Sequence, residues 1–345
     1  MFLSATGDSL IADPRWYPTR RVETHMLEGL IAGPQSHLSD ALVNAIPSGT
    51  SISAGGIELS DHVAKVSLNG TLPSDDRGKQ LMAWEISQTL QRSGRVNSVE
   101  INVGGEALPS SGLPSQPSFD LDSAVALNSN GLVRIDGRSV STRILPITPS
   151  SSASLPAVSP VSSSLLAWRE DDRLVLVDSS TNATRVVDGS EGQYSPSIDR
   201  FGWVWDIPRG GNLRASRIDG QNLAIASENQ SLNGVSAVRV SPDGARALLL
   251  RQVGGSTSAW IAGIERRGSG EPIALTDPEP LAGLSTGVDD VSWAGRSTVV
   301  AVRQGGLRAG NDQVDEVSLV TVPVGGFPSV LALPTGTQRL SAGSS

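Results

Sequence analysis

Residues able to carry chemistry are few in this sequence. The chain contains no cysteine, which excludes disulfides, thiolate metal sites and cysteine nucleophiles. Its histidines are His25, His37 and His62, and a proline separates the first two, so they cannot share a helix face as the two histidines of a zinc helix do. No Gly-x-Ser-x-Gly elbow stands between an expected strand and an expected helix. We therefore expect no catalytic residue, no metal site and no bound cofactor.

Adjacent aspartates are the other candidates for acid–base chemistry. A glycosidase needs two carboxylates about 5–9.5 Å apart across a cleft, whereas neighbouring residues of a strand point to opposite faces of a sheet. Asp75-Asp76 precedes a helical pattern and is expected to cap that helix. Asp171-Asp172 and Asp289-Asp290 are expected to lie in turns. All three pairs are therefore interpreted as structural.

An aromatic series supplies the candidate binding residues. Phe201, Trp203 and Trp205 are two residues apart, so in a strand they would share one face. One interpretation is that the rings fill the core, since large rings bury much apolar area. The other is an exposed ladder that stacks on sugars or contacts a partner, with Arg200 beside it, because interfaces favour Trp and Arg. These four residues are the candidate partner-binding residues.

Length and charge limit the classes of protein that fit. A chain of 345 residues leaves room for about two domains. It carries 27 basic and 35 acidic residues, a net charge of −8, which disfavours nucleic acid as a partner. The first residues lack the basic and apolar regions of a secretory signal, and no apolar run approaches the ~18 residues of a membrane helix. The sequence alone therefore predicts a soluble globular chain.

The first hundred residues have the periodicity of an α+β domain. Apolar residues at helical spacing predict a helix from about Arg20 to Ala32, which Gly33-Pro34 would end. A second, brief helix is expected over Ser36–Ile46. A third carries Met82, Ile86 and Leu90 on one face. Alternating patterns predict strands at 51–53, 56–59, 64–68 and 96–103, and residues 2–13 are expected to form a hairpin whose first strand is cut by the start of the chain.

Helical periodicity ends after this domain. Residues 104–118 are rich in Pro, Gly and Ser and are expected to form a linker. Residues 119–345 contain a repeat with starts 36, 46 and 51 residues apart. A period of about 40–50 residues with several short strands is typical of propeller blades. We expect about five blades, a set that need not be complete, with repeat starts at Ser159-Pro160, Ser195-Pro196, Ser241-Pro242 and Ser292-Trp293.

The chain is therefore predicted to be multi-domain, with an α+β domain over 1–103 followed by an all-β propeller-like domain. The first domain resembles a GerMN domain of sporulation and germination proteins. The second resembles the propeller of LpqB-type actinobacterial lipoproteins, in which a GerMN domain precedes a C-terminal propeller. The residues that carry the resemblance to GerMN are 22–34, 45–50, 63–68, 80–90 and 96–103.

This resemblance implies a location and a partner. Members of the family are exported, are anchored to the outer face of the cell membrane through an acylated N-terminal cysteine, and associate with a two-component sensor histidine kinase in cell-envelope homeostasis. This sequence shows no signal peptide, no lipid-accepting cysteine and no region ahead of the GerMN-like domain. Membrane attachment is therefore expected only through a lipid anchor that is missing from this chain.

Three functional hypotheses follow. The first is a non-enzymatic accessory protein that binds the extracytoplasmic domain of a sensor kinase and modulates its signalling. The second is a module that binds cell-wall glycan or peptide, which predicts exposed aromatic rings beside acidic or amide groups. The third is a propeller hydrolase, which predicts converging carboxylates or a histidine in a cleft; the confinement of histidine to residues 25–62 weighs against it.

Overall fold

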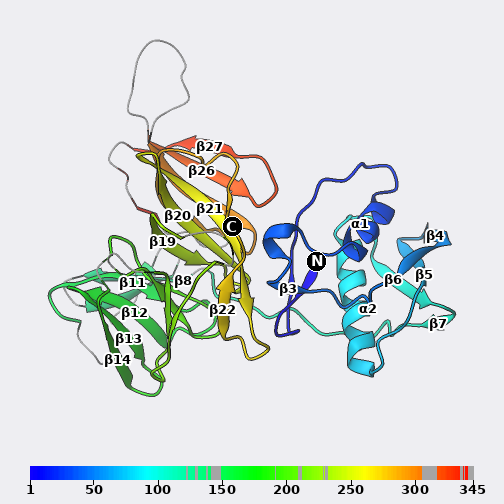
Figure 1. Cartoon of the computed structure of the whole chain (residues 1–345), viewed down its shortest axis with the longest axis horizontal. Helices are drawn as coiled ribbons and strands as arrows, with labels where there is room; N and C mark the ends of the chain where they lie inside the picture. The colour runs from blue at the N-terminus through cyan, green and yellow to red at the C-terminus, as the bar shows by residue number, and fades with distance from the viewer. Residues whose placement is uncertain are drawn as a thin grey trace, which may run out of the picture. The chain divides into compact units, whose positions relative to one another are not determined.

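The computed structural model shows two compact units (Figure 1). The first unit is Met1–Pro117 with Arg266–Gly270, and the second is Ser118–Glu265 with Glu271–Ser345. Within the described part of the chain, no helix has both the length and the hydrophobicity needed to cross a membrane. The described residues are 1–121, 123–128, 131–136, 139–140, 149–190, 192–208, 212–227, 229, 232–304, 317–334, 337 and 339–340.

The first unit combines helices with two small sheets. One sheet has the order β4-β5-β6-β7, and only its β5–β6 pair is parallel. A parallel pair needs a crossover connection, which α2 provides. The other sheet has the order β2-β1-β3. The elements are β1 (Phe2–Ser4), β2 (Leu10–Ile11), α1 (Val22–Ile31), η1 (Ser36–Leu38), β3 (Leu42–Val43), β4 (Ser51–Ser60), β5 (Val63–Asn69), α2 (Asp76–Gln91), β6 (Ser98–Val103) and β7 (Glu106–Ala107).

Helix α2 shows how sequence and packing agree. Asp75 caps it, because its Oδ1 accepts the Gly78 N–H at 2.6 Å. Met82, Ile86 and Leu90, four residues apart, are all fully buried. The helix contacts α1, β1 and β6. The predicted cap and the predicted third helix are confirmed, and α1 confirms the first.

The second predicted helix is wrong beyond its first turn. Only Ser36–Leu38 is helical, and Leu42–Val43 forms β3 instead. Leu42 pairs with Ser4 of β1 in an antiparallel ladder. Leu38 and Leu42 are both buried, so their four-residue spacing reflects burial from a turn and a strand rather than from one helix face. The predicted hairpin over residues 2–13 forms, with Phe2 opposite Ile11.

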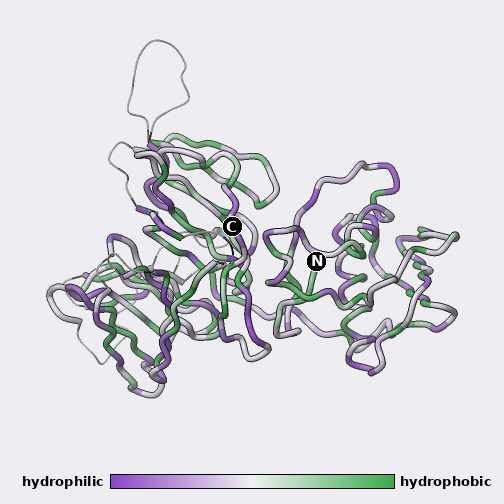
Figure 2. Tube along the Cα trace, in the orientation of Figure 1, coloured by the Kyte–Doolittle hydropathy of each residue, from purple (hydrophilic) through white to green (hydrophobic). Residues whose placement is uncertain are grey.

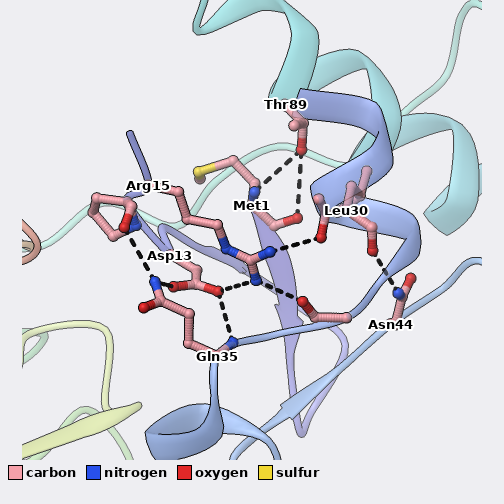
Figure 3. A network of polar contacts seen from close by, with 10 residues as sticks. Met1, Asp13, Arg15, Leu30, Gln35, Asn44 and Thr89 are labelled. Atoms are coloured by element: carbon pink, nitrogen blue, oxygen red, sulfur yellow. Dashed lines mark hydrogen bonds and ion pairs between the residues drawn. The ribbon is translucent and has the colours of Figure 1, made fainter. Parts of the chain in front are cut away.

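Two polar groups fasten the hairpin to the rest of the first unit. The buried carboxyl group of Glu85 accepts the Leu3 N–H at 3.2 Å and the Ala45 N–H at 2.9 Å. Burial raises the pKa of Glu85 to about 8, and these two hydrogen bonds only partly oppose that shift. Arg15 donates to Asp13 at 2.6 Å and to the Gly29 carbonyl at 2.8 Å, which satisfies a carbonyl near the end of α1 (Figure 3).

The second unit is all-β. Its described residues form five sheets that follow one another along the chain, and in four of them four successive strands lie in meander order. The first strands of successive sheets contact each other, from β8 through β11, β15 and β19 to β24. This is the arrangement of β-propeller blades. The α+β unit is thus followed by a propeller-like all-β unit, as the sequence predicts.

The strands of the second unit have the following bounds, sheet by sheet: β8 (Ser123–Asn128), β9 (Gly131–Asp136) and β10 (Ser139–Val140); β11 (Ala153–Val158), β12 (Leu165–Glu170), β13 (Arg173–Asp178) and β14 (Ala183–Asp188); β15 (Ser197–Ile198), β16 (Val204–Asp206), β17 (Arg214–Ser216) and β18 (Asn222–Ala224); β19 (Val235–Val240), β20 (Arg246–Val253), β21 (Ser256–Arg266), β22 (Pro272–Leu275) and β23 (Glu279–Pro280); β24 (Val288–Trp293), β25 (Thr298–Gln304), β26 (Val317–Pro323) and β27 (Ser329–Ala332).

The core of this unit lies between the sheets. Each of its hydrophobic clusters joins residues from two successive sheets, as Leu174 of β13 and Val204 of β16 do. A strand covered on both faces needs apolar side chains in succession rather than in alternation. Leu174–Val177 is such a run, and Figure 2 shows hydrophobic residues, in green, along the strands of this unit.

In the sheet β15–β18, the turn that follows the first strand begins at a different residue from the one that the Ser-Pro alignment predicts. Ser241-Pro242 follows the first strand of its sheet, whereas Ser195-Pro196 precedes β15. The equivalent of Ser241 in that sheet is Asp199, because each donates its N–H to the carbonyl that closes the turn, at 2.9 Å in both cases. The prediction was wrong there because an aspartate replaces the Ser-Pro pair. The turns after the first strands begin at Ser159, Asp199, Ser241 and Ala294.

Candidate functional site

Two of the predicted binding residues lie in the core. Trp203 and Trp205 are fully buried, in the cluster between the sheet β15–β18 and the sheet β19–β22. The indole N–H of Trp205 donates to Asp199 Oδ2 at 2.9 Å. A buried indole that keeps a hydrogen-bond partner is well placed as a core residue. These rings therefore fill the space between sheets and offer no exposed face for stacking.

Arg200 and Phe201 lie in the turn before β16, so the aromatic series is not one strand face. The guanidinium of Arg200 lies 4.7 Å from the Phe201 ring centre and 5.8 Å from the ring centre of Phe119. Arg296, from the corresponding turn of the last sheet, lies 4.8 Å from the same Phe119 ring. Partner binding by Arg200 and Phe201 stays a prediction, and within the chain Arg200 and Arg296 both lie over the ring of Phe119.

A series of buried, hydrogen-bonded polar side chains lies at the end of the sheets where their first strands begin. This end is opposite to the turns that contain Arg200 and Arg296. Arg169, in β12, donates to the carbonyl of Tyr194 at 2.9 Å and to the hydroxyl of Ser190 at 2.6 Å. The Ser190 hydroxyl in turn donates to the buried carboxylate of Asp206. Arg214 completes the series with two hydrogen bonds to Asp206, at 3.0 and 2.8 Å. Burial lowers the pKa of Arg169, and Asp206 partly offsets this.

A second polar group adjoins the first, and we call it the Tyr194 site; it consists of Gln193, Tyr194, Arg239, Asp289 and Asp290. Arg239 pairs with Asp290 Oδ1 at 3.3 Å and donates to the carbonyl of Ser195 at 2.7 Å. The hydroxyl of Tyr194 donates to the carbonyl of Asp289 at 3.0 Å. Burial lowers the pKa of Arg239, and the charge of Asp290 partly offsets this. Arg239 and Asp290 thus hold each other's side chains in place, and the hydroxyl of Tyr194 is held by the backbone of β24.

Residues 339–340 of the same chain contact the Tyr194 site. The guanidinium of Arg339 lies 4.3 Å from the centre of the Tyr194 ring and donates to the Gln193 carbonyl at 2.6 Å. The N–H of Leu340 donates to Asp290 Oδ2 at 3.2 Å. An arginine and the following backbone N–H are therefore recognised by an aromatic ring, a carbonyl and a carboxylate.

The sequence did not point to the Tyr194 site. The prediction that Asp289-Asp290 lies in a turn was wrong, because both residues are in β24 and the Asp290 side chain is almost fully buried. A signal did exist in the strands themselves. Arg169 follows the apolar run Leu165–Trp168 and Arg239 lies between two valines, and a charged residue in a buried strand needs a partner. The partners lie up to 51 residues away, which spacing alone does not reveal.

The other candidates for chemistry have structural roles. His25 pairs with Glu28 at 3.1 Å on the surface of α1, and His62 contacts the carbonyl of Arg95 at 3.0 Å. Asp171-Asp172 occupies the turn between β12 and β13, as predicted. Among the described residues, no group of three or more His, Cys, Asp or Glu side chains is arranged to hold a metal ion.

One motif of the nucleophile-elbow type does occur, in the loop between β23 and β24. Residues 283–287 read Gly-Leu-Ser-Thr-Gly, but a strand follows rather than a helix. Both glycines have positive φ, +82° and +68°. A Cβ at Gly287 would lie 2.6 Å from the carbonyl oxygen of Gln304. Gly287 is therefore required by close packing on β25, and Gly283 by its approach to Pro328, whose Cγ would lie 2.9 Å from a Cβ there.

Comparison with known families agrees with this architecture. A family model described as the lipoprotein LpqB β-propeller domain matches residues 128–340, more than half of the chain. The chain belongs to the LpqB family. A second model, described as sporulation and spore germination, matches residues 1–109. Both parts of the resemblance predicted from the sequence are confirmed.

Similar individual proteins were also found. Lipoprotein LpqB of Mycolicibacterium smegmatis (strain ATCC 700084 / mc(2)155) is 25% identical over 347 residues, covering 88% of this chain and 57% of that protein. This LpqB-family chain thus spans little more than half the length of that relative. Among solved structures, TolB from Acinetobacter baumannii is 15% identical with a TM-score of 0.44, covering 73% of this chain and 72% of that one. A putative TolB from Agrobacterium tumefaciens is 15% identical with a TM-score of 0.47, covering 66% and 84%.

Proposed function

We propose that this protein is a non-enzymatic accessory lipoprotein of the cell envelope that binds the extracytoplasmic domain of a two-component sensor kinase and modulates its signalling. Membership of the LpqB family supports the envelope location, since the family description and the relative from M. smegmatis both carry the word lipoprotein. The kinase is the partner that the family resemblance implies. We place the contact on the second unit.

The observation that carries the proposal is an exposed apolar edge at β27. This strand is the last of its sheet in the order β24-β25-β26-β27, and all four of its residues are exposed. Leu331 is 66% exposed and Phe327, just before the strand, is 76% exposed. Val330 is also exposed. We call Phe327, Val330 and Leu331 the β27 edge.

An edge of this kind favours a protein partner. Val330 and Leu331 are successive residues of the strand and lie on its two faces, so an exposed apolar side chain flanks the edge on each side, and exposed apolar surface marks sites of protein interaction. An edge strand also presents backbone N–H and C=O groups to which another strand can add. Natural edges are commonly protected by charged residues, yet Ser329–Ala332 carries none. Trp203 and Trp205, the aromatic ladder that the glycan hypothesis would use, are buried, which favours the kinase over the glycan hypothesis.

Calorimetric titration tests the proposal. The chain is titrated with the purified extracytoplasmic domain of the sensor kinase from the same organism. Saturable binding is expected, and Leu331→Glu is expected to weaken it at least about tenfold, because a charge would be buried in an apolar contact. Val186→Glu is the matched control, since Val186 is 50% exposed on β14, the last strand of another sheet.

The possible results separate the hypotheses. Wild-type affinity in the control and weak binding in Leu331→Glu support the proposal. No binding between a folded chain and a folded kinase domain would overturn the choice of partner, and heat on titration with cell-wall fragments would then favour the glycan hypothesis. Equal loss in both variants would overturn the assignment of the contact to the β27 edge.

A further inference from the structure

We propose that the Tyr194 site is a binding site for an arginine side chain in an extended peptide of a partner protein, and that Arg339 and Leu340 of this chain occupy it as an internal competitor. The inference goes beyond the proposed function, because it does not require the partner to be a kinase and concerns a different surface from the β27 edge. The contacts of residues 339–340 define what the site recognises.

The site recognises a guanidinium in two ways. The charge of Arg339 lies 4.3 Å from the centre of the Tyr194 ring, within the ~6 Å range of cation–π attraction. The same group donates to the carbonyl of Gln193 at 2.6 Å. A planar guanidinium can stack on a ring and donate in its own plane at once, whereas the compact ammonium of lysine cannot. The site therefore selects arginine over lysine.

The residue after the arginine is recognised through its backbone. Asp290 Oδ2 accepts the Leu340 N–H at 3.2 Å, while Oδ1 is held by Arg239 and by the N–H of Val291 at 2.9 Å. A carboxylate fixed in this way needs no rearrangement to accept a peptide N–H, so little ordering cost remains when the ligand binds. This contact does not depend on the side chain that follows the arginine.

Neighbouring residues hold the Tyr194 ring and the aspartates of β24 in position. Tyr194 packs against the hydrophobic cluster of the last two sheets, and its hydroxyl donates to the Asp289 carbonyl at 3.0 Å. The amide of Gln304 donates to the carboxylate of Asp289 at 2.6 Å. The strand β24 therefore supports both the ring and the carboxylate. Such support from neighbouring residues is what distinguishes a preorganised site from a chance surface contact.

Repulsion between like charges favours the release of Arg339, so that an arginine of a partner peptide can take its place. Burial is the main cause that lowers the pKa of Arg239, and the positive charge of Arg339 lowers it further. The two guanidinium groups, Arg339 against the Tyr194 ring and Arg239 against Asp290, therefore repel each other within one site. The tether supplies the internal occupant with an effective concentration of about millimolar. A free peptide must overcome this advantage, so its binding should become tighter when the internal arginine is removed.

Fluorescence anisotropy with a labelled peptide tests the inference. The peptide has the sequence of residues 335–342, and a second peptide carries lysine in place of its arginine. The receptor is the full chain, either wild type or Arg339→Ala. Arg339→Ala is expected to bind the arginine peptide at least about tenfold more tightly than wild type, and at least about tenfold more tightly than it binds the lysine peptide. Arg173→Ala, which removes an exposed arginine elsewhere, is the control and should bind as wild type does.

Further variants locate the binding. Tyr194→Leu, added to Arg339→Ala, is expected to abolish peptide binding, and Asp290→Asn in the same background provides a second variant if the first fails to fold. Leu331→Glu should bind the peptide as wild type does, so failure here is distinct from failure of the proposed kinase contact.

Three results would overturn the inference. Arg339→Ala could bind the peptide no more tightly than wild type, or the arginine and lysine peptides could bind equally. The third result is no binding up to about 1 mM, which is the effective concentration of the internal competitor.

Discussion

Arg239 and Asp290 form an ion pair between the first strands of two successive sheets, with 3.3 Å between Nη2 and Oδ1. Both side chains are largely buried, and 51 residues separate them in the sequence. Arg239 also donates to the carbonyl of Ser195, which precedes the first strand of a third sheet. One arginine thus connects three sheets of the second unit and orients the carboxylate that contacts Leu340.

Replacement of Asp290 by alanine is expected to destabilise the second unit by about 3–5 kcal/mol, because Arg239 would stay buried without its counter-charge. Asp290→Asn keeps an acceptor and should cost less. Asp188→Ala is the control, since the Asp188 side chain is 89% exposed and its loss should change stability by no more than about 0.5 kcal/mol. Urea denaturation measures all three. Equal effects of Asp290→Ala and Asp188→Ala would contradict a structural role for the pair.

Trp205 should behave as a core residue. Trp205→Ala is expected to lower the free energy of unfolding by about 3–5 kcal/mol, because it leaves a cavity between two sheets. The change would also remove the hydrogen bond to Asp199. Trp16→Ala serves as the control, since Trp16 is 73% exposed. Thermal unfolding compares the variants, and a Trp205→Ala protein that melts with the wild type would show that the indole contributes little to the core.

The N-terminus of α2 depends on one aspartate. Asp75→Ala is expected to destabilise the first unit by about 1 kcal/mol, because the Gly78 N–H would lose its acceptor. Asp75→Asn should retain nearly all of the stability, since asparagine caps helices about as well as aspartate. Guanidinium denaturation of the three proteins distinguishes the cap from a simple charge effect. A loss as large in Asp75→Asn as in Asp75→Ala would show that charge, and not the hydrogen bond, matters.

The pH dependence of the first unit should reveal Glu85. Its pKa is raised from the ordinary 4.5 to about 8, so between these values the folded state holds the proton more tightly than the unfolded state. The contribution of Glu85 is therefore most favourable below pH 4.5 and falls as the pH rises toward 8, by at most about 1.4 kcal/mol per pH unit. The Met1 amine, whose pKa burial lowers to about 6, opposes this trend above pH 6.

The comparison with Glu85→Gln isolates this contribution. The glutamine does not titrate. The Met1 amine is present in both proteins, and without the Glu85 charge its pKa in the variant is lowered further, which changes the difference in the same direction. The melting temperature of the wild type minus that of Glu85→Gln is therefore expected to fall steadily between pH 5 and pH 8. Glu106→Gln, an exposed site, should show no such trend against wild type. A constant difference between wild type and Glu85→Gln would contradict the raised pKa.

Local signals in the sequence predicted the helices well. Asp75 and the series Met82, Ile86 and Leu90 specify both the start and the buried face of α2 without reference to the rest of the chain. The segment 36–46 was mispredicted because Leu42 pairs with Ser4, almost forty residues earlier. Short apolar spacings of this kind are shared by helices, turns and strands, and a distant strand decides between them.

The candidate site depended on contacts that spacing does not encode. The alternation of Phe201, Trp203 and Trp205 fits an exposed face or a buried one equally, and only the neighbouring sheet decides that both tryptophans are covered. The Tyr194 site forms only where β24 contacts two segments that are distant in the sequence, the loop before β15 and residues 339–340. Arginines next to apolar residues in buried strands were the one local sign of it.

The central claim, that the β27 edge contacts a kinase domain, is tested most directly by amide hydrogen exchange of the chain with and without that domain. Slower exchange is expected in residues 317–332, which include β26 and β27, because a bound strand or surface would cover their amides. Residues 183–188 of β14, another last strand, should exchange unchanged. Unchanged exchange in β26 and β27 under saturating kinase domain, or slowing confined to other sheets, would contradict the claim.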